Sequence, residues 1–388
     1  MAITIGISRV EAQVTIGGDD APATGSVLSL NSDTKGGLLL SNVYLDDLTK
    51  IPVGFPGITS EDQDDHLKKD FIGAVVYNTN GLVGKGKGIY VWSDIGWNYV
   101  GGGTGSLDTG RVAYRNSASG PITGWLEFMT YNLGATPMTI DEQKASLYFN
   151  VPASYADETA ASDFKAIYGD MYQWGRNTDG HEKVWSTTYN GQVPESSYAN
   201  AGNEFKIGYA DWLEGGNSKQ GRWGGETADT PPTTINYKGE NDPCPPGFRV
   251  PSTEEWQGIV NGVGGANQIT SINAQNGYKG VNKWKWQNGG TATISGWLIY
   301  PPKPDVTNPV SDDDYEENPT LFLPAAGWRY YNNGNLEDVS VKYGYYWSST
   351  SSTSGHQAYI LTFNYELFWN NYPQPRSFGQ SIRCVREH

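Results

Sequence analysis

The sequence has few cysteines, few histidines, a deficit of positive charge and no long apolar run. Two Cys and four His among 388 residues fit none of the usual spacings of a tetrahedral zinc site. The net charge of -15 repels nucleic-acid phosphates and anionic lipid surfaces. No segment approaches the roughly 20 apolar residues that a membrane helix requires. We therefore expect no zinc, no nucleic-acid partner and no transmembrane segment, which leaves neutral or cationic partners.

Aromatic residues and glycine are abundant instead. The chain has 14 Trp, 25 Tyr and 11 Phe, and its 49 Gly and 21 Pro are scattered between short aromatic or β-branched runs. This spacing is typical of a β-rich, loop-rich protein. The length suits one large domain or two ordinary ones.

The N-terminus and the cysteines bear on the cellular compartment. Val10-Glu11-Ala12 follows a short apolar stretch with the small-residue spacing of a signal-peptidase site, so residues 1–12 are interpreted as the remnant of a secretory signal. The alternative is an ordinary first strand that starts at Met1. An even pair of cysteines agrees with export, where disulfides persist, but also with two buried thiols of a cytosolic protein.

Composition changes near residue 104. Residues 13–104 contain short strand-like runs at 27–30 and 38–40 and a predicted β-hairpin formed by 72–77 and 88–92. We interpret this part as a small N-terminal β module for attachment or homo-oligomerisation. The glycine-rich run at 101–105 is the predicted linker.

Residues 105–388 contain one clear helix signal. Ser252 and Glu255 form a capping-box pattern, Trp256, Ile259 and Val260 follow with helical spacing, and glycines then end the pattern. Strand-like runs occur at 321–324, 345–347, 358–363 and 380–385. We therefore predict a β-dominated α+β class with one or two short helices.

Five segments carry a family resemblance. Residues 242–256 (DPCPPGFRVPSTEEW) resemble the hallmark of the Fibrobacter succinogenes major paralogous domain. The other matching segments, in the expected order, are 128–133, 168–174, 323–327, and 346–349 with 381–386. The resemblance implies a C-type-lectin-like fold over residues 105–388. Residues 13–100 more loosely resemble N-terminal modules of Bacteroidetes surface and tail-fibre-like proteins.

The same resemblance bears on catalysis. The family is related to formylglycine-generating enzymes, whose chemistry needs a reactive cysteine pair near the C-terminal end of the domain. Here Cys244 and Cys384 are far apart in sequence and only the terminal His388 is near either of them, whereas an activated thiolate needs a cationic neighbour. We therefore expect a structural disulfide between Cys244 and Cys384 and no enzymatic activity.

No cofactor is predicted, and calcium is the one metal that the sequence raises. The acidic run 312–318 lacks the alternating spacing and glycine of a calcium loop, so a solvated acidic loop is favoured. The segments 317–319 and 369–371 depart from the Glu-Pro-Asn and Trp-Asn-Asp triplets of calcium-dependent lectins. Glu254 and Glu255 could suggest a glycosidase, but the capping box already explains Glu255.

The predicted ligand-binding segment is 364–377, which mixes large aromatic rings with amides and a guanidinium, as binding hot spots do. Its candidate contact residues are Tyr365, Phe368, Trp369, Asn370, Asn371, Tyr372, Gln374 and Arg376. A second candidate patch is the segment 328–333, with Trp328, Arg329 and Tyr331 as its candidate contact residues. The alternative is that Phe368 and Trp369 belong to the core and the asparagines only form turns.

These observations predict a secreted or surface-exposed, non-catalytic recognition protein, displayed by a cell or a phage particle. Its lectin-like domain would bind a glycan or a protein receptor, because aromatic faces and amide donors suit both. The first alternative is a structural subunit of a surface fibre, a pilus or a phage tail fibre. The second alternative is an exported hydrolase.

Overall fold

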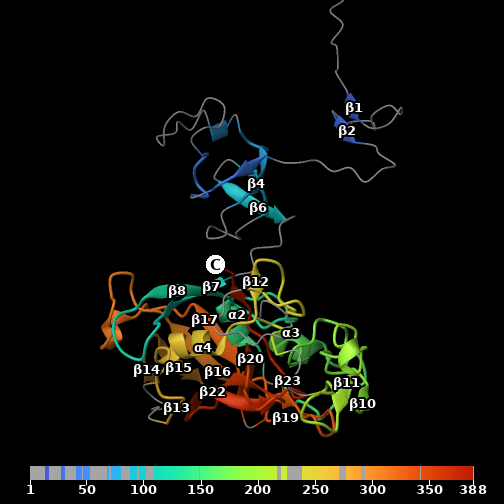
Figure 1. The fold of residues 1–388 in the computed structure, drawn as a ribbon. Helices are drawn as coiled ribbons and strands as arrows, with labels where there is room; N and C mark the ends of the chain where they lie inside the picture. The colour runs from blue at the N-terminus through green and yellow to red at the C-terminus, as the bar shows by residue number, and fades with distance from the viewer. Residues whose placement is uncertain are drawn as a thin grey trace, which may run out of the picture. The chain divides into compact units, whose positions relative to one another are not determined.

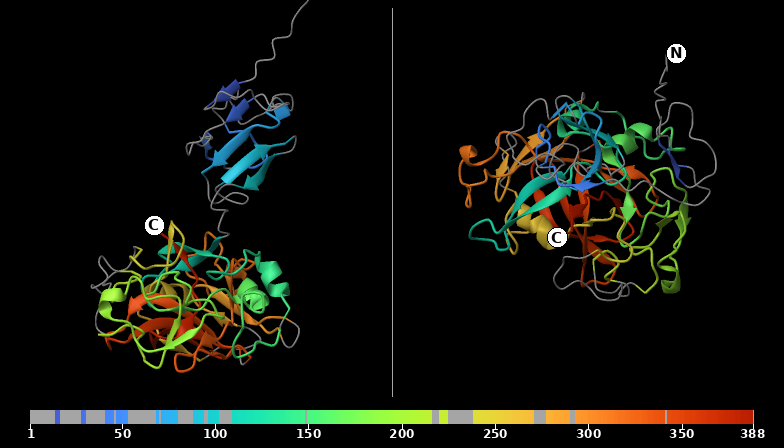
Figure 2. Two further views of the ribbon diagram at one scale, coloured as in Figure 1. Left: turned by 90° about the vertical axis from the view of Figure 1, so that its right-hand side faces the viewer. Right: turned by 90° about the horizontal axis from the view of Figure 1, so that it is seen from above.

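The structure is a computed structural model, drawn as a ribbon in Figures 1 and 2. The chain divides into two compact units, Met1–Gly105 and Ser106–His388. The residues that the structure describes are 14–16, 28–30, 41–45, 47–52, 68–69, 71–79, 88–93, 96–101, 109–147, 149–215, 220–224, 238–270, 277–289, 293–340 and 342–387. The predicted signal remnant, the strand at 38–40 and residues 102–105 of the predicted linker lie outside them. No helix among the described residues has the length and apolar character needed to cross a membrane.

The first unit contains a four-stranded sheet and a separate parallel pair. The sheet has the order β3 (Asn42–Val43), β4 (Val75–Asn78), β5 (Gly88–Trp92) and β6 (Trp97–Gly101), and the pair is β1 (Val14–Ile16) with β2 (Leu28–Leu30). β4 and β5 are antiparallel, which confirms the predicted hairpin. Trp92 and Trp97 are buried in the core of the first unit, where they pack edge to face with ring centroids 5.3 Å apart. Their indole N–H groups donate to the carbonyls of Lys68 and Lys50.

The second unit is built from small sheets. One four-stranded sheet has the order β12 (Phe248–Arg249), β24 (Val385–Arg386), β8 (Gly124–Met129) and β7 (Thr109–Tyr114), and a second has the order β13 (Gln268–Ile269), β22 (Phe368–Pro375), β21 (Gln357–Phe363) and β20 (Gly344–Ser351). A third has the order β14 (Tyr278–Lys279), β15 (Lys283–Gln287), β16 (Gly296–Tyr300) and β17 (Leu321–Pro324), and a fourth has the order β19 (Leu336–Glu337), β18 (Trp328–Arg329), β23 (Gly379–Gln380) and β9 (Tyr172–Gln173). A two-stranded sheet pairs β10 (Thr188–Asn190) with β11 (Phe205–Ile207).

Short helices complete the second unit. They are α2 (Ile140–Ala145), α3 (Ser162–Tyr168) and α4 (Thr253–Val260), with 3₁₀ turns η1 (Glu195–Ser197) and η2 (Asp312–Asp314). The β-dominated α+β class is confirmed, and α2 and α3 are additional to the helix that the sequence analysis identified. The α4 cap is confirmed as well: Ser252 Oγ accepts from Glu255 N–H at 3.0 Å and Glu255 Oε2 accepts from Ser252 N–H at 2.8 Å.

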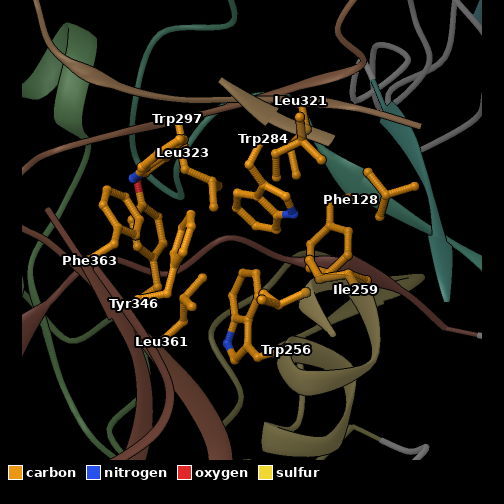
Figure 3. Packing of buried hydrophobic residues seen from close by; sticks show 14 of the residues in the cluster. Phe128, Trp256, Ile259, Trp284, Trp297, Leu321, Leu323, Tyr346, Leu361 and Phe363 are labelled. Atoms are coloured by element: carbon orange, nitrogen blue, oxygen red, sulfur yellow. The ribbon is translucent and has the colours of Figure 1, made fainter. Parts of the chain in front are cut away.

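The largest core cluster of the second unit is rich in tryptophan. Figure 3 shows Trp256 of α4 facing the aromatic side chains that strands β8, β15, β16, β20 and β21 contribute. Trp256 stacks on Phe128 with ring centroids 5.3 Å apart, and its indole N–H donates to the carbonyl of Trp347. Because such rings bury large apolar areas, α4 is fixed against β20, β21 and β22 by this cluster.

Cys244 and Cys384 form the predicted disulfide. Both are buried, and the bond lies beside the two-stranded contact in which Phe248 and Arg249 of β12 pair with β24. It therefore ties the segment before α4 to the last strand of the chain, across a sequence separation of 140.

Candidate functional site

The predicted binding segment forms strand β22, whose two faces differ. Directly opposed residues of antiparallel strands point to the same face of a sheet. Phe368 is opposite Phe363, which is opposite Gly344. Phe363 and Phe368 belong to the tryptophan-rich core cluster, in which Figure 3 labels Phe363, so this row faces the core. Trp369 is opposite Thr362, which is opposite Tyr345. Trp369 and Tyr345 therefore share the other face of the sheet.

A register shift brings a second aromatic side chain to that face. Between the pairs Ile360–Tyr372 and Thr362–Trp369, β22 has one residue more than β21. This extra residue is a β-bulge. Without it, Tyr372 would point away from Trp369, because side chains alternate along a strand. With it, the two rings stack at 4.7 Å with an interplanar angle of 10°.

The second predicted patch joins this face through Tyr345. The Trp328 ring lies between Tyr345 at 4.5 Å and Phe378 at 4.3 Å, stacked on both. Further rings surround these three, with centroid distances of 4.8–6.3 Å: Tyr330, Tyr331 and Tyr343. We call the combined set the aromatic platform: Trp328, Tyr330, Tyr331, Tyr343, Tyr345, Trp369, Tyr372 and Phe378.

Tyr345 is a buried ring of the platform whose hydroxyl group is hydrogen-bonded. The pKa of Tyr345 is raised, first by burial, then by its hydrogen bond to Asp338, and further by Tyr343 and Tyr372. Tyr345 Oη donates to Asp338 Oδ2 at 2.8 Å, and Asp338 has a left-handed φ of 63°. A non-glycine residue in this conformation is strained and is commonly found at functional sites.

The exposed part of the platform is large enough for contact. Tyr372 is 37% exposed, and Tyr365, in the loop between β21 and β22, is 44% exposed. Trp328, Tyr330, Tyr331, Tyr343 and Trp369 are half-buried. Rings that pack on neighbouring rings on one side and are exposed on the other lose little conformational entropy when they bind a ligand.

Phe368 is not a contact residue. Its side chain is fully buried, with ring centroids 4.7 Å from Trp297 and 5.0 Å from Trp284. The core alternative therefore holds for Phe368, because its position on β22 faces the tryptophan cluster. Trp369, its neighbour, faces the platform and is half-buried.

Three polar residues of the predicted segment are also buried. Asn370 donates to Asn261 Oδ1 at 2.8 Å, at the C-terminal end of α4. Arg376 is fully buried over the Trp174 ring and pairs with Asp211 at 3.1 Å. Gln374 is buried opposite Ala358. These side chains have no surface to offer a ligand, whereas Asn371 is half-buried.

Arg329 of the second predicted patch is buried too, because it faces away from its neighbour Trp328. Its guanidinium donates to the carbonyls of Gly334, Lys183 and Ser186 at 2.7–2.9 Å. It also lies over the Phe205 ring. Burial lowers the pKa of Arg329 to about 9. Arg329 therefore joins loops and does not contact a ligand.

One group in the described part of the chain has the composition of a metal site: Asp179, His181 and Glu182, with potential ligand atoms within 4.8 Å of one another. Its donors are already occupied. His181 Nε2 accepts from the Gln173 N–H at 2.9 Å, so Nδ1 carries the proton that is donated to Asp179. Asp179 also accepts two bonds from Arg176. Burial, followed by the Arg176 charge, lowers the pKa of His181 to about 4. The group is a neutral-imidazole network that supports β9.

The acidic run considered for calcium is engaged in local bonds. Asp312 pairs with Lys279 at 3.0 Å and with Lys283 at 2.5 Å. Asp314 accepts from the backbone N–H groups of Val310 and Ser311. Both carboxylates thus have partners within the protein, as expected for a solvated loop rather than a preformed cation site.

The fold and the site define a β-dominated α+β domain that carries an aromatic platform formed by strands of two sheets and the loops beside them. Residues 123–386 match the family model described as the Fibrobacter succinogenes major domain. The match covers well over half of the chain, and the chain belongs to this family. All platform residues lie within the matched span. No curated protein and no solved structure matches the chain.

The sequence analysis missed three platform residues: Tyr343, Tyr345 and Phe378. A signal for two of them was present, because Tyr343 directly precedes β20 and is two residues from Tyr345, a spacing that puts side chains of extended backbone on the same face. No local signal shows that this face continues onto Trp328 and Trp369, since those contacts join strands that are distant in the sequence.

Proposed function

We propose that this protein is an exported, non-catalytic recognition protein and that the aromatic platform is its ligand-binding surface. The observation that carries the proposal is the aromatic platform, in which half-buried Trp328 stacks on Tyr345 and Phe378 and half-buried Trp369 stacks on exposed Tyr372. The favoured ligand is a glycan, because the CH faces of sugars stack on aromatic rings while hydroxyls bond to neighbouring polar groups. The lectin-like fold that the family resemblance implies is consistent with this role.

Polar groups at the edge of the platform support a hydrated ligand. The carboxylate of Asp338 is held by Tyr345, and the Asn332 amide donates to the Tyr330 hydroxyl at 2.6 Å. Tyr365 and Tyr372 bring exposed rings, each with a hydroxyl at its edge. An aromatic ring next to a hydrogen-bonding group is typical of surfaces that bind glycans or protein receptors.

Export and the absence of catalysis are part of the proposal. The disulfide joins the two cysteines of the chain, and such bonds persist in oxidising compartments. It also removes both thiols as nucleophiles. His181 is occupied on both ring nitrogens, so it has no free position for proton transfer.

A glycan array and a cell-surface binding screen with the full chain test the proposal, each run with and without a calcium chelator. Tyr372→Ala should remove a contact of about 2 kcal/mol or more, which is roughly a thirtyfold loss of affinity. The matched control is Tyr44→Ala, which removes a tyrosine that is 62% exposed in the first unit. It should leave binding unchanged.

The outcomes separate the alternatives. Glycan binding lost in Tyr372→Ala and retained in Tyr44→Ala supports the proposal. Binding to cells that soluble glycans do not compete away would instead indicate a protein receptor. Unchanged binding in Tyr372→Ala would reject the platform as the contact surface, and concentration-dependent assembly in sedimentation would then favour the fibre-subunit alternative.

A further inference from the structure

A polar cavity separate from the platform is formed where four distant segments meet. Its volume is about 410 Å³, within the usual range of small-ligand pockets of about 300–1,000 Å³. The lining residues come from the end of β7, the loop after α4, strand β14 and the loop before η2: Arg115, Ala118, Asn261, Gly265, Ala266, Tyr278, Lys279, Gly280, Asn308 and Pro309.

Arg115 is the charged group that has no acidic partner there. No carboxylate of the described residues forms an ion pair with it, and its Nε is buried without a hydrogen bond. Its one side-chain bond is a long one, from Nη2 to Asn308 Oδ1 at 3.4 Å. The buried Nε is therefore not accessible to a ligand, whereas the residue as a whole is half-buried. In a chain of net charge -15, an arginine kept free of carboxylates points to an acceptor that comes from outside.

The surroundings of Arg115 are positive and rich in amides. Lys279 shares the carboxylate of Asp312 with Lys283, so two ammonium groups face one acid and Arg115 adds a further positive charge. The phenol of Tyr278 lines the same cavity as Arg115.

The wall of the cavity contacts strand β22. The buried Asn370 amide donates to Asn261 Oδ1 and to the Ala266 carbonyl, both of which line the cavity. Asn370 Oδ1 itself is buried and has no hydrogen-bond partner among the described residues. Asn370 therefore lies behind the cavity, while its neighbour Trp369 faces the platform.

We propose that this cavity binds the carboxylate of an acidic sugar. The planar guanidinium of Arg115 matches a carboxylate in a two-bond geometry. The limited positive charge suits a monoanion, and the net negative charge of the chain disfavours polyanions. Amide and phenol groups of Asn261, Asn308 and Tyr278 surround the guanidinium and provide partners for sugar hydroxyls. The proposal concerns a site other than the platform and holds independently of the platform's role.

The test is a titration of the full chain with D-glucuronate, followed by ligand-observed NMR. Arms with D-glucose, acetate and inorganic phosphate separate the sugar, the carboxylate and the general anion. Arg115→Gln should weaken glucuronate binding at least tenfold, since it removes a charge-assisted pair of bonds. The control is Arg111→Gln, the same charge change at an exposed arginine of β7 that lies over Trp125.

Asn308→Ala, on an exposed loop, provides a second variant that does not disturb the core. Preferential binding of glucuronate, weakened in Arg115→Gln and Asn308→Ala but not in Arg111→Gln, supports the site, with unchanged melting temperatures as the folding control. Equal binding of glucose, acetate or phosphate would overturn the assignment to an acidic sugar. Unchanged glucuronate binding in folded Arg115→Gln would overturn the site itself.

Discussion

The two faces of β22 predict opposite consequences for two aromatic truncations on the same strand. Phe368→Ala removes a ring that is fully buried among Trp284, Trp297 and Phe363. Replacing a buried Phe by Ala costs about 3–5 kcal/mol through lost transfer energy and the cavity that remains. Tyr372→Ala removes a ring that is 37% exposed and stacks on Trp369. Its loss should cost the free energy of about one aromatic pair, roughly 0.5–1.5 kcal/mol.

Thermal and denaturant unfolding of the full chain, followed by tryptophan fluorescence, measure the difference. For a domain of this size, 1 kcal/mol shifts the melting temperature by about 2–4 °C. Phe368→Ala should therefore lower the melting temperature of the second unit by roughly 10 °C, and Tyr372→Ala by only a few degrees. Binding should respond in the reverse order when folded protein is compared. Equal destabilisation by the two variants would refute the assignment of the two faces.

Three further predictions follow from the covalent structure, the unit boundary and a buried imidazole. Denaturation without reductant should expose no alkylatable thiol, and reduction of the Cys244–Cys384 bond, which spans 140 residues, should lower the free energy of unfolding by about 5 kcal/mol on the loop-entropy model; alkylation of both thiols in air-oxidised protein would contradict this. Limited proteolysis followed by mass spectrometry should first release a fragment that starts near Ser106, where the two units divide, because few contacts cross a domain boundary; initial cleavage within 200–240 would place the boundary elsewhere. In an NMR titration, the His181 imidazole should still be neutral at pH 5, because burial lowers its pKa to about 4. Its contribution to stability is then complete above the unfolded-state pKa of about 6.5 and is lost as the pH falls toward 4; protonation near pH 6.5 in folded protein would contradict the network.

Local patterns in the sequence determined several elements. The capping box at Ser252 and Glu255 depends only on residues three apart, so α4 was predictable. The hairpin of β4 and β5 follows from alternation in two neighbouring runs. The same capping-box pattern, Thr139 with Glu142, also starts α2. This helix has only six residues and no strong apolar stripe, so the sequence pattern did not predict it.

The composition of the candidate site was also readable from the sequence, but its geometry was not. The aromatic residues of 365–376 and 328–331 identified two segments, and the tertiary structure joined them through Tyr345. The side on which each residue of β22 lies depends on the bulge opposite β21, which shifts the alternation by one. No pattern within β22 alone shows that shift, because it is defined by pairing with another strand.

The tertiary structure, and not the local sequence, determines which groups surround each arginine. Arg329, Arg376 and Arg115 look equivalent in the sequence, as single arginines beside aromatic or polar neighbours. Packing buries Arg329 against backbone carbonyls and pairs Arg376 with Asp211, 165 residues away. Arg115 is left beside a cavity without an acid. A guanidinium is stabilised in the interior only by the acceptors that surround it, and the assembled fold, not the local sequence, determines which acceptors those are.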